Sequence, residues 1–323
     1  MPLLGTCVGV LVLAVGASLA FGSNPIPLAD VVPALTGSGD EYVQQVVDSR
    51  VPRTLHGLLA GCCLAVAGVI MQGITRNPLG DPGLLGVNVG AAAAVVTATA
   101  FLGVGGGAGT VWVALIGALL AMVVVHLIGS GRDTATPVRL VLAGAVVNAV
   151  LTAYIQGITL SLPNAFDSYR FWVVGSLAGR GTDVLIDILP FAAIGLVLAV
   201  LLATGLNALA LGETAATALG ARTSAIRAGG IAAAALLCGA ATAAVGPIAF
   251  IGLAVPHIAR AVVGSDHRWQ IPFSLTLGPA LLLAADVLGR VVARPQELMV
   301  GVVTAFVGAP FLLVVVRRMR GSG

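Results

Sequence analysis

Ten long apolar runs, almost free of charge, constrain this chain more than any other feature of its sequence. They lie near residues 3–21, 54–74, 84–102, 110–129, 138–160, 184–205, 223–245, 247–263, 272–292 and 298–316. A hydrocarbon core of ~30 Å requires about 20 apolar residues per crossing helix, and within it only helices or closed barrels satisfy every backbone amide. The runs lack the period of two that barrel strands show. The sequence therefore predicts an all-α, polytopic membrane protein with about ten transmembrane helices, with residues 1–323 as a single transmembrane domain.

The composition excludes an ordinary soluble domain. The charged fraction is 9% and the hydrophobic fraction 58%, with a mean hydropathy of +1.06, whereas soluble domains carry about 25% charged residues. A chain of 323 residues this poor in charge could not cover a surface that faces water. Residues 1–20 lack the basic region of a signal peptide, so they are predicted to form the first membrane helix.

All 16 basic residues are arginine, and their distribution predicts the orientation. With the N-terminus inside and the spans alternating, ten of them fall inside: Arg76, Arg132, Arg139, Arg222, Arg227, Arg260, Arg268, Arg317, Arg318 and Arg320. The other six fall outside: Arg50, Arg53, Arg170, Arg180, Arg290 and Arg294. Because loops rich in basic residues remain in the cytoplasm, both termini are predicted to be cytoplasmic.

The residue types also limit the chemistry. A nucleotide-binding P-loop needs a lysine in G-x-x-x-x-G-K-[ST], and this chain has none, so any ATP hydrolysis is predicted to belong to a partner. Four cysteines and four histidines show no metal-ligand spacing, and no paired catalytic constellation is present, so neither a metal site, nor a catalytic residue, nor a cofactor of the chain's own is predicted. A transporter driven by an ion gradient usually carries carboxylates in mid-span. Only Asp286 and Glu297 lie near apolar runs here, both toward the outside, so a secondary transporter is kept only as the less favoured alternative.

Two polar segments interrupt the apolar pattern. The stretch RNPLGDPGLLGVNVG (76–90) is predicted to be a cytoplasmic turn between the second and third spans, in which Arg76 and Asp81 meet water. Residues 211–227, LGETAATALGARTSAIR, are predicted to form two short helices on the cytoplasmic face. Leu211, Ala215, Ala218 and Leu219 have helical spacing, Glu213 suits a helix N-terminus and Gly220 a helix end. The alternative is a plain connecting loop.

Several segments together resemble the FecCD family, the membrane subunits of ATP-binding-cassette (ABC) importers for iron-siderophores, haem and vitamin B12. They are RVPRTLHGLLAG (50–61), MQGITRNPLGDPGLLGVNVGA (71–91), FWVVGSLAGR (171–180), GPIAFIGLAVPHIAR (246–260), DHRWQIP (266–272) and ELMVGVVTAFVGAPF (297–311). The resemblance implies ten helices per subunit in the bacterial cytoplasmic membrane. It also implies a second permease subunit, two cytoplasmic ATPase subunits that bind ATP and Mg²⁺, and an extracytoplasmic substrate-binding protein, but no nucleic acid. The motifs resemble siderophore members most closely, and haem or vitamin B12 remain alternatives within the family.

The resemblance also implies roles for particular residues. Arg50, Arg53 and Arg290 match positions that meet glutamates of the binding protein in the B12-importer member, although they could instead be ordinary interface anchors. The segment 211–227 matches the coupling helices that dock on the ATPase, with Leu211, Gly212, Glu213, Leu219 and Gly220 as the candidate contacts. Asn88 is the candidate gate residue of the translocation pathway, and Gln72 and Asn148 are further candidates. For these three, the alternative is an interhelical hydrogen bond.

Overall fold

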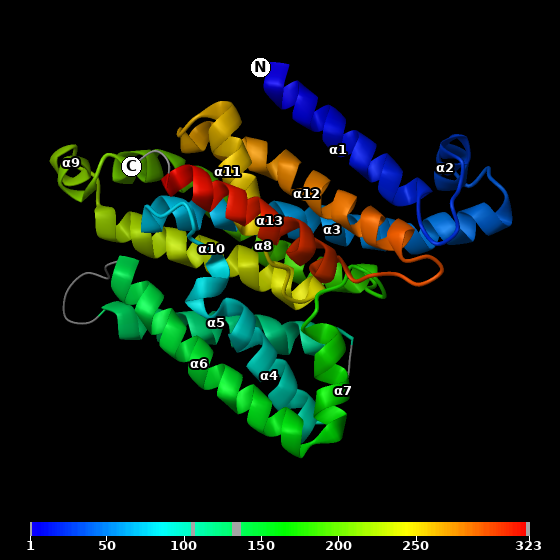
Figure 1. The fold of residues 1–323 in the computed structure, drawn as a ribbon, viewed down its shortest axis with the longest axis horizontal. Coiled ribbons are helices and arrows are strands. Elements are labelled where there is room, and N and C mark those ends of the chain that lie inside the picture. Colours follow the sequence, from blue (N-terminus) through cyan, green and yellow to red (C-terminus); the bar gives the residue numbers. More distant parts are fainter. Residues whose placement is uncertain (1, 105–106, 131–136, 321–323) are drawn as a thin grey trace.

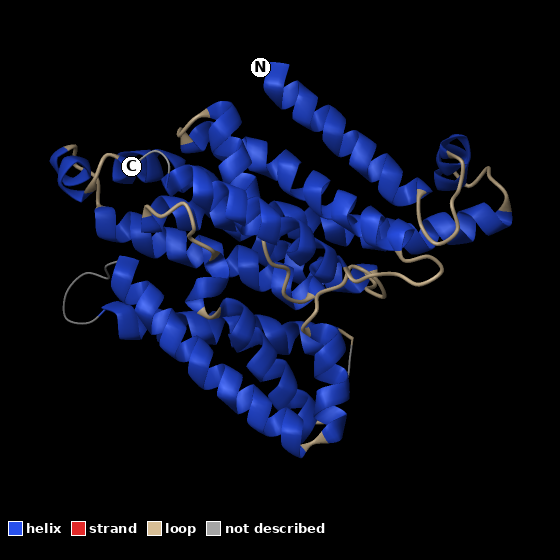
Figure 2. Cartoon of the chain, viewed as in Figure 1, coloured by secondary structure: helices blue, strands red, loops and turns tan. Residues whose placement is uncertain are grey.

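The computed structural model describes residues 2–104, 107–130 and 137–320, and this part of the chain contains helices and loops but no strand (Figure 2). Ten helices correspond to the ten predicted spans: α1 (Pro2–Ala20), α3 (Glu41–Thr75), α4 (Val87–Phe101), α5 (Ala108–Ser130), α6 (Pro137–Ser161), α8 (Thr182–Ala210), α10 (Thr223–Val245), α11 (Ile251–Val263), α12 (His267–Val292) and α13 (Val300–Arg320). Among the described residues, seven helices are long and apolar enough to cross a membrane, and α4, α11 and the apolar part of α13 are shorter. The all-α prediction is confirmed.

The helices form an elongated bundle with two distinct ends. Figure 1 shows α9 (Glu213–Ala218) and the C-terminal part of α13 at one end, and α2 (Leu28–Leu35) and α7 (Pro163–Trp172) at the other. We call these the α9 end and the α2 end. The arginine count predicts that the α9 end is the cytoplasmic one; Arg132, one of the arginines assigned to that side, lies outside the described residues.

Helix α3 passes through the middle of the bundle and contacts α8, α10, α11 and α12. Together with α10 it is the most buried of the long helices, whereas α1, α6 and α8 are the least buried. Small residues permit this packing, as is common in membrane proteins. A Cβ on Gly61 would lie 2.5 Å from the backbone of Pro279 in α12, and one on Gly68 would overlap the backbone of Gly252 in α11.

Three elements were not predicted, because hydropathy identifies only what crosses the membrane. The short helices α2 and α7 connect spans at the α2 end. Helix α3 begins at Glu41, well before the apolar run at 54, and continues past Pro52. Its 35 residues span about 52 Å, more than the ~30 Å of a hydrocarbon core.

The turn after α3 differs from the prediction that it remains in water. Residues Pro82–Leu85 form a 3₁₀ helix, η1, that contacts α3, α4, α5, α6 and α10. Leu85 is buried and Asp81 is only partly exposed, and the Asp81 Oδ1 accepts a hydrogen bond from the Gly83 amide at 2.7 Å. Arg76 is exposed, as predicted. Pro82 and Leu85 of the turn are buried in the bundle, and α4 begins at Val87, so it is shorter than the predicted 84–102.

Candidate docking, coupling and gate sites

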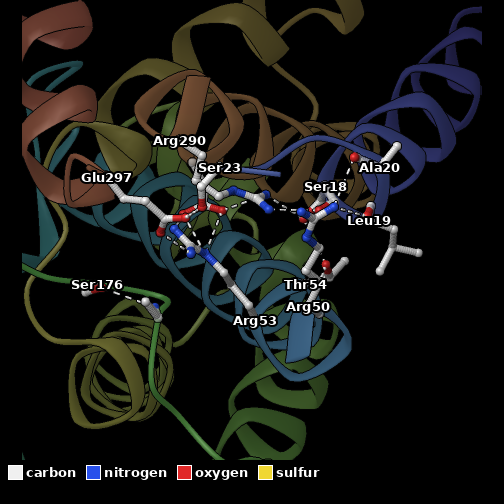
Figure 3. A network of polar contacts seen from close by, with 12 residues as sticks. Ser18, Leu19, Ala20, Ser23, Arg50, Arg53, Thr54, Ser176, Arg290 and Glu297 are labelled. Carbon is white, nitrogen blue, oxygen red and sulfur yellow. Dashed lines mark hydrogen bonds and ion pairs between the residues drawn. The ribbon is translucent and has the colours of Figure 1, made fainter. Parts of the chain in front are cut away.

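The three candidate docking arginines converge at the α2 end, where α3 and α12 lie against the end of α1 (Figure 3). Arg53 binds the carboxylate of Asp286 through two nitrogens, Nη2 to Oδ1 at 2.8 Å and Nε to Oδ2 at 3.0 Å. Its Nη1 donates to Glu297 Oε2 at 2.6 Å. Arg290 binds the same aspartate, with its Nη2 2.9 Å from Oδ2. Asp286 is thus the centre of a network that joins α3, α12 and the loop before α13.

Arg50 and Arg290 also hold the C-terminus of α1. Arg50 Nη1 donates to the carbonyl oxygens of Leu19 and Ala20 at 2.8 and 2.9 Å. Arg290 Nη1 donates to the carbonyl oxygen of Ser18 at 2.9 Å and its Nη2 to the Ser18 hydroxyl at 3.1 Å. The last carbonyls of a helix lack intrahelical partners, and the helix dipole favours cations there. The two arginines therefore cap α1 and fix it to the α3–α12 pair.

The three guanidinium groups differ in their exposure. Arg290 is 1% exposed and Arg50 is also buried, whereas the side chains of Arg53 and Glu297 are 13% and 31% exposed. All three arginines and Glu297 line a cavity of about 240 Å³. Burial alone would raise the pKa of Glu297, but the hydrogen bond and charge of Arg53 outweigh burial and hold that pKa below its usual value. Only the Arg53–Glu297 pair is open to a partner in this conformation.

Asp286 and Glu297 were not predicted as site residues. A signal for Asp286 was present, because it precedes Arg290 by four residues on one helix, the spacing at which opposite charges meet. The pairing with Arg53 joins residues 233 positions apart, and no local pattern predicts it.

The candidate coupling segment contains one short helix, not two. Helix α9 covers Glu213–Ala218, and the predicted second helix is the beginning of α10, which starts at Thr223. Because its end at Val245 matches the predicted span, the polar residues near 223 are the first turns of a membrane helix. The buried face also differs from the predicted one, which consisted of Leu211, Ala215, Ala218 and Leu219. In the structure the buried residue of α9 is Ala216.

Helix α9 is held in place while its flanking leucines are exposed. The carboxylate of Glu213 accepts two hydrogen bonds from Arg227 of α10, at 3.1 and 3.3 Å. Leu211 and Leu219 are 66% and 70% exposed. Gly220, with φ of +82°, ends the segment in the left-handed region that favours glycine. The arrangement presents two apolar side chains on a fixed support at the α9 end.

Two of the three candidate pathway residues, Asn88 and Asn148, lie near the η1–α4 junction. The Oδ1 of Asn88 in α4 accepts a hydrogen bond from the Thr242 hydroxyl of α10 at 2.8 Å. Asn148 of α6 lies near Gly86, with its Oδ1 3.7 Å from where a Cβ on Gly86 would be, and this buried oxygen has no hydrogen-bond partner among the described residues. Gln72 is buried elsewhere, near Arg260, in a separate cavity at the α9 end.

Within the described residues, no group of three or more His, Cys, Asp or Glu side chains could hold a metal ion. The four cysteines are free thiols.

Comparison with known proteins then decides the family. Residues 10–318 match the model of the FecCD transport family. The chain belongs to this family. Curated FecCD relatives include the ferric enterobactin transport system permease protein FepD of Escherichia coli (strain K12), 47% identical over 97% of this chain and 94% of that one. The probable siderophore transport system permease protein YfiZ of Bacillus subtilis (strain 168) is 38% identical over 96% and 93% of the two chains.

The hemin transport system permease protein HmuU of Yersinia pestis is a more distant relative, 34% identical over 88% of this chain and 86% of that one. Among solved structures, one described as an inward-facing conformation of a metal-chelate type ABC transporter superposes with a TM-score of 0.87 at 27% identity, covering 98% of both chains.

FecCD proteins are permease subunits of ABC transporters and lack an ATPase site of their own. This chain is therefore a multi-pass membrane subunit of a transporter complex.

Proposed function

We propose that this chain is the permease subunit of an ABC importer that moves a ferric siderophore across the bacterial cytoplasmic membrane. The observation that carries the proposal is the 47% identity, over nearly the whole chain, to a permease for ferric enterobactin. Relatives named for ferric citrate and hemin are less similar, at 36% and 34%. A haem importer is the second candidate because of that last resemblance.

The proposed complex contains a second permease subunit, identical or homologous, two cytoplasmic ATPase subunits that bind ATP and Mg²⁺, and an extracytoplasmic binding protein. The absence of lysine, and hence of a P-loop, supports hydrolysis by the partner. The α9 end would then be cytoplasmic, with both termini on that side, and the α2 end would face the binding protein. Transport would proceed by alternating access, driven by ATP-dependent closure of the ATPases.

Docking of the binding protein is proposed to use the arginine cluster at the α2 end. Arg53 is the direct contact, because it is the most open of the three and its partner Glu297 can be exchanged for a carboxylate of the binding protein. The buried Arg50 and Arg290 add positive electrostatic potential at this site and hold α1 in place through hydrogen bonds to its last carbonyl groups. Charge complementarity of this kind raises the association rate and sets the register more than it raises affinity.

Coupling is proposed to use residues 211–220. Leu211 and Leu219 would insert into a groove on the ATPase, while Gly212 and Gly220 shape the turns and Glu213 transmits force to α10 through Arg227. The gate is proposed to lie at the η1–α4 junction, where the Asn88 side chain is near Gly83 and the Asn148 side chain is near Gly86. Gln72 is buried at the α9 end, where it could contact cargo only at the cytoplasmic exit.

An uptake experiment tests the substrate class. Escherichia coli cells lacking FepD would express this chain together with its partner ATPase and binding-protein subunits, and uptake of ⁵⁵Fe-enterobactin would be compared with uptake of hemin. Restored, ATP-dependent siderophore uptake with no hemin uptake is the expected result. Uptake of hemin alone would replace the siderophore proposal with the haem candidate. Uptake of neither cargo, with the complex assembled in the membrane, would contradict both.

A further inference from the structure

The side chain of Asn207 joins the end of α8 to the start of α12. Its Oδ1 accepts hydrogen bonds from the backbone amide of His267 at 2.9 Å and from His267 Nδ1 at 2.8 Å. Its Nδ2 donates to Oδ1 of Asp266, the N-cap residue of α12. Within the described part of the chain, these are the only hydrogen bonds between α8 and α12 with its N-cap. Both polar atoms of one amide group are therefore used to connect the two helices.

The partners of Asn207 determine the orientation of its amide group. A backbone N–H can only donate, so the atom that faces the His267 amide is the oxygen, and the nitrogen faces the Asp266 carboxylate. The first N–H groups of a helix lack intrahelical acceptors. Asp266 Oδ1 accepts from the Arg268 amide at 2.9 Å, so α12 is capped both by its own N-cap residue and by a residue of α8. The hydrogen bonds from the Arg268 amide and from Asn207 hold the pKa of Asp266 below its usual value, so the bond from Asn207 meets a carboxylate that is ionised at neutral pH.

The start of α12 lies directly against the end of α3. A Cβ on Gly73 of α3 would be 2.7 Å from His267 Nε2, so the buried imidazole packs on the α3 backbone without a side chain between them. Below this point α3 and α12 contact each other extensively. A displacement of the α8 end would therefore reach α12 through Asn207 and α3 through His267.

Asn207 also lies next to the candidate coupling segment. Helix α8 ends at Ala210 and the segment begins at Leu211, about one helical turn after Asn207. On its other side, the segment is joined to α10 by the ion pair between Glu213 and Arg227. The segment is thus connected to two different sets of helices, to α10 through an ion pair and to α12 and α3 through Asn207.

We propose that Asn207 is a positioning residue for energy coupling, which transmits a displacement of residues 211–220 from α8 to α12 and α3. The inference rests on the proposed function, because it requires the ATPase subunits to bind this segment. Helices α3 and α12 carry Arg53 and Asp286 at the α2 end, so the connection would extend from the ATPase side of the permease to its docking side. Without Asn207, the segment would still act on α10, but α12 would no longer follow α8.

The test is hydrogen exchange, read by mass spectrometry, of the full chain in complex with its ATPase subunits, with and without ATP trapped by vanadate. In the unmodified chain, trapping should change amide exchange in 211–220 and also in 265–271, which contains the His267 amide. Asn207→Leu keeps a similar shape but removes all three hydrogen bonds, so the response at 211–220 should remain and the response at 265–271 should be lost. Thr204→Leu is the matched control, because Thr204 is exposed on the same helix and makes no described hydrogen bond to α12.

A charge exchange separates coupling from mere packing. Asn207→Asp keeps an acceptor for His267 but places a second carboxylate against Asp266, so it should also lose the response at 265–271. Adding Asp266→Asn restores a donor and an acceptor between the two positions, so the response should return. A side chain that only fills space would not be rescued in this way.

The outcomes are distinct. Loss of the 265–271 response in both single variants, with its return in the exchanged pair, supports the proposal. An unchanged response in Asn207→Leu, an equal loss in Thr204→Leu, or no rescue in the exchanged pair refutes it. If 211–220 does not respond in the unmodified chain, the coupling proposal itself fails. The measurement needs no cargo, so it is independent of whether a siderophore or haem is transported.

Discussion

Removing the carboxylate of Asp286 is the sharpest test of the network at the α2 end. In Asp286→Ala, Arg53 retains Glu297, but Arg290 retains only the Ser18 hydrogen bonds and becomes a buried charge without a counter-ion. Breaking a buried ion pair by deleting one partner typically costs about 3–5 kcal/mol. Because Asp286 is fully buried and binds two guanidinium groups, we expect a loss in the upper part of that range.

The chain supplies a matched control. Asp167 and Arg170 form an ion pair at 3.1 Å in α7, and both side chains are more than half exposed. Asp167→Ala removes the same chemical group, and an exposed pair contributes about 0–1 kcal/mol. The free energy of unfolding of both variants can be measured by equilibrium denaturation in mixed micelles, followed by the fluorescence of the three tryptophans.

A double variant distinguishes charge imbalance from lost packing. Asp286→Leu with Arg290→Leu removes both members of the pair, and replacing a buried pair with apolar groups is often neutral or stabilising. We therefore expect the double variant to be more stable than Asp286→Ala. If Asp286→Ala instead loses no more stability than Asp167→Ala, the network does not hold the helices together and the reasoning is wrong.

Three further predictions concern docking, coupling and pH. Arg53→Glu should weaken binding-protein association and reduce its salt dependence, since charge steering is screened beyond a Debye length of ~8 Å at physiological ionic strength. The measurement is the association rate constant as a function of salt concentration. If the salt dependence is the same in the variant as in the unmodified chain, Arg53 is not a contact. Leu219→Ser should weaken ATPase assembly, measured by co-purification, without lowering permease stability because Leu219 is exposed; full assembly would show that the segment is passive. Glu297→Gln should cost roughly 0–1 kcal/mol at neutral pH. Because the folded-state pKa of Glu297 lies below its ordinary value, this difference should persist above the unfolded-state pKa and vanish as pH falls through the folded-state pKa; a difference that grows in acid would have the wrong sign.

The sequence predicted those parts of the fold that a single physical requirement determines. Crossing a bilayer demands a long apolar run, so all ten spans were identifiable. Elements that do not cross the membrane have no such requirement. Helices α2 and α7 and the first turns of α3 were missed for that reason, and η1 was placed in water because two prolines and an aspartate usually indicate an exposed turn.

The candidate sites were less predictable because their geometry depends on pairings between distant helices. Family resemblance selected Arg50, Arg53 and Arg290, and the structure does bring them together. The resemblance did not indicate that Arg50 and Arg290 cap α1, because these contacts join residues that are far apart in the sequence. The separation is about 30 positions for Arg50 and 272 for Arg290. Nor could the sequence indicate that Gln72 lies at a different place from Asn88 and Asn148, because all three are polar residues within apolar runs.

The α3–α12 pair links the two polar sites of the molecule. Along α3, Arg53 belongs to the network at the α2 end, and Gln72, about 28 Å further by helix rise, belongs to the cavity at the α9 end. Along α12, Asp286 and Gln270 lie about 24 Å apart and belong to the same two sites.

Between these sites, Gly61 of α3 packs directly against the backbone of Pro279 of α12. No side chain lies between the two backbones there, so the distance between the helices cannot change by a side-chain rearrangement. A relative rotation of the two helices about this contact would move their ends in opposite directions. The ion pairs oppose such movement at the α2 end, whereas no described ion pair joins α3 to α12 at the α9 end. Any rocking of the pair is therefore expected to change the cavity at the α9 end, which Gln72 and Gln270 line, more than the arginine network.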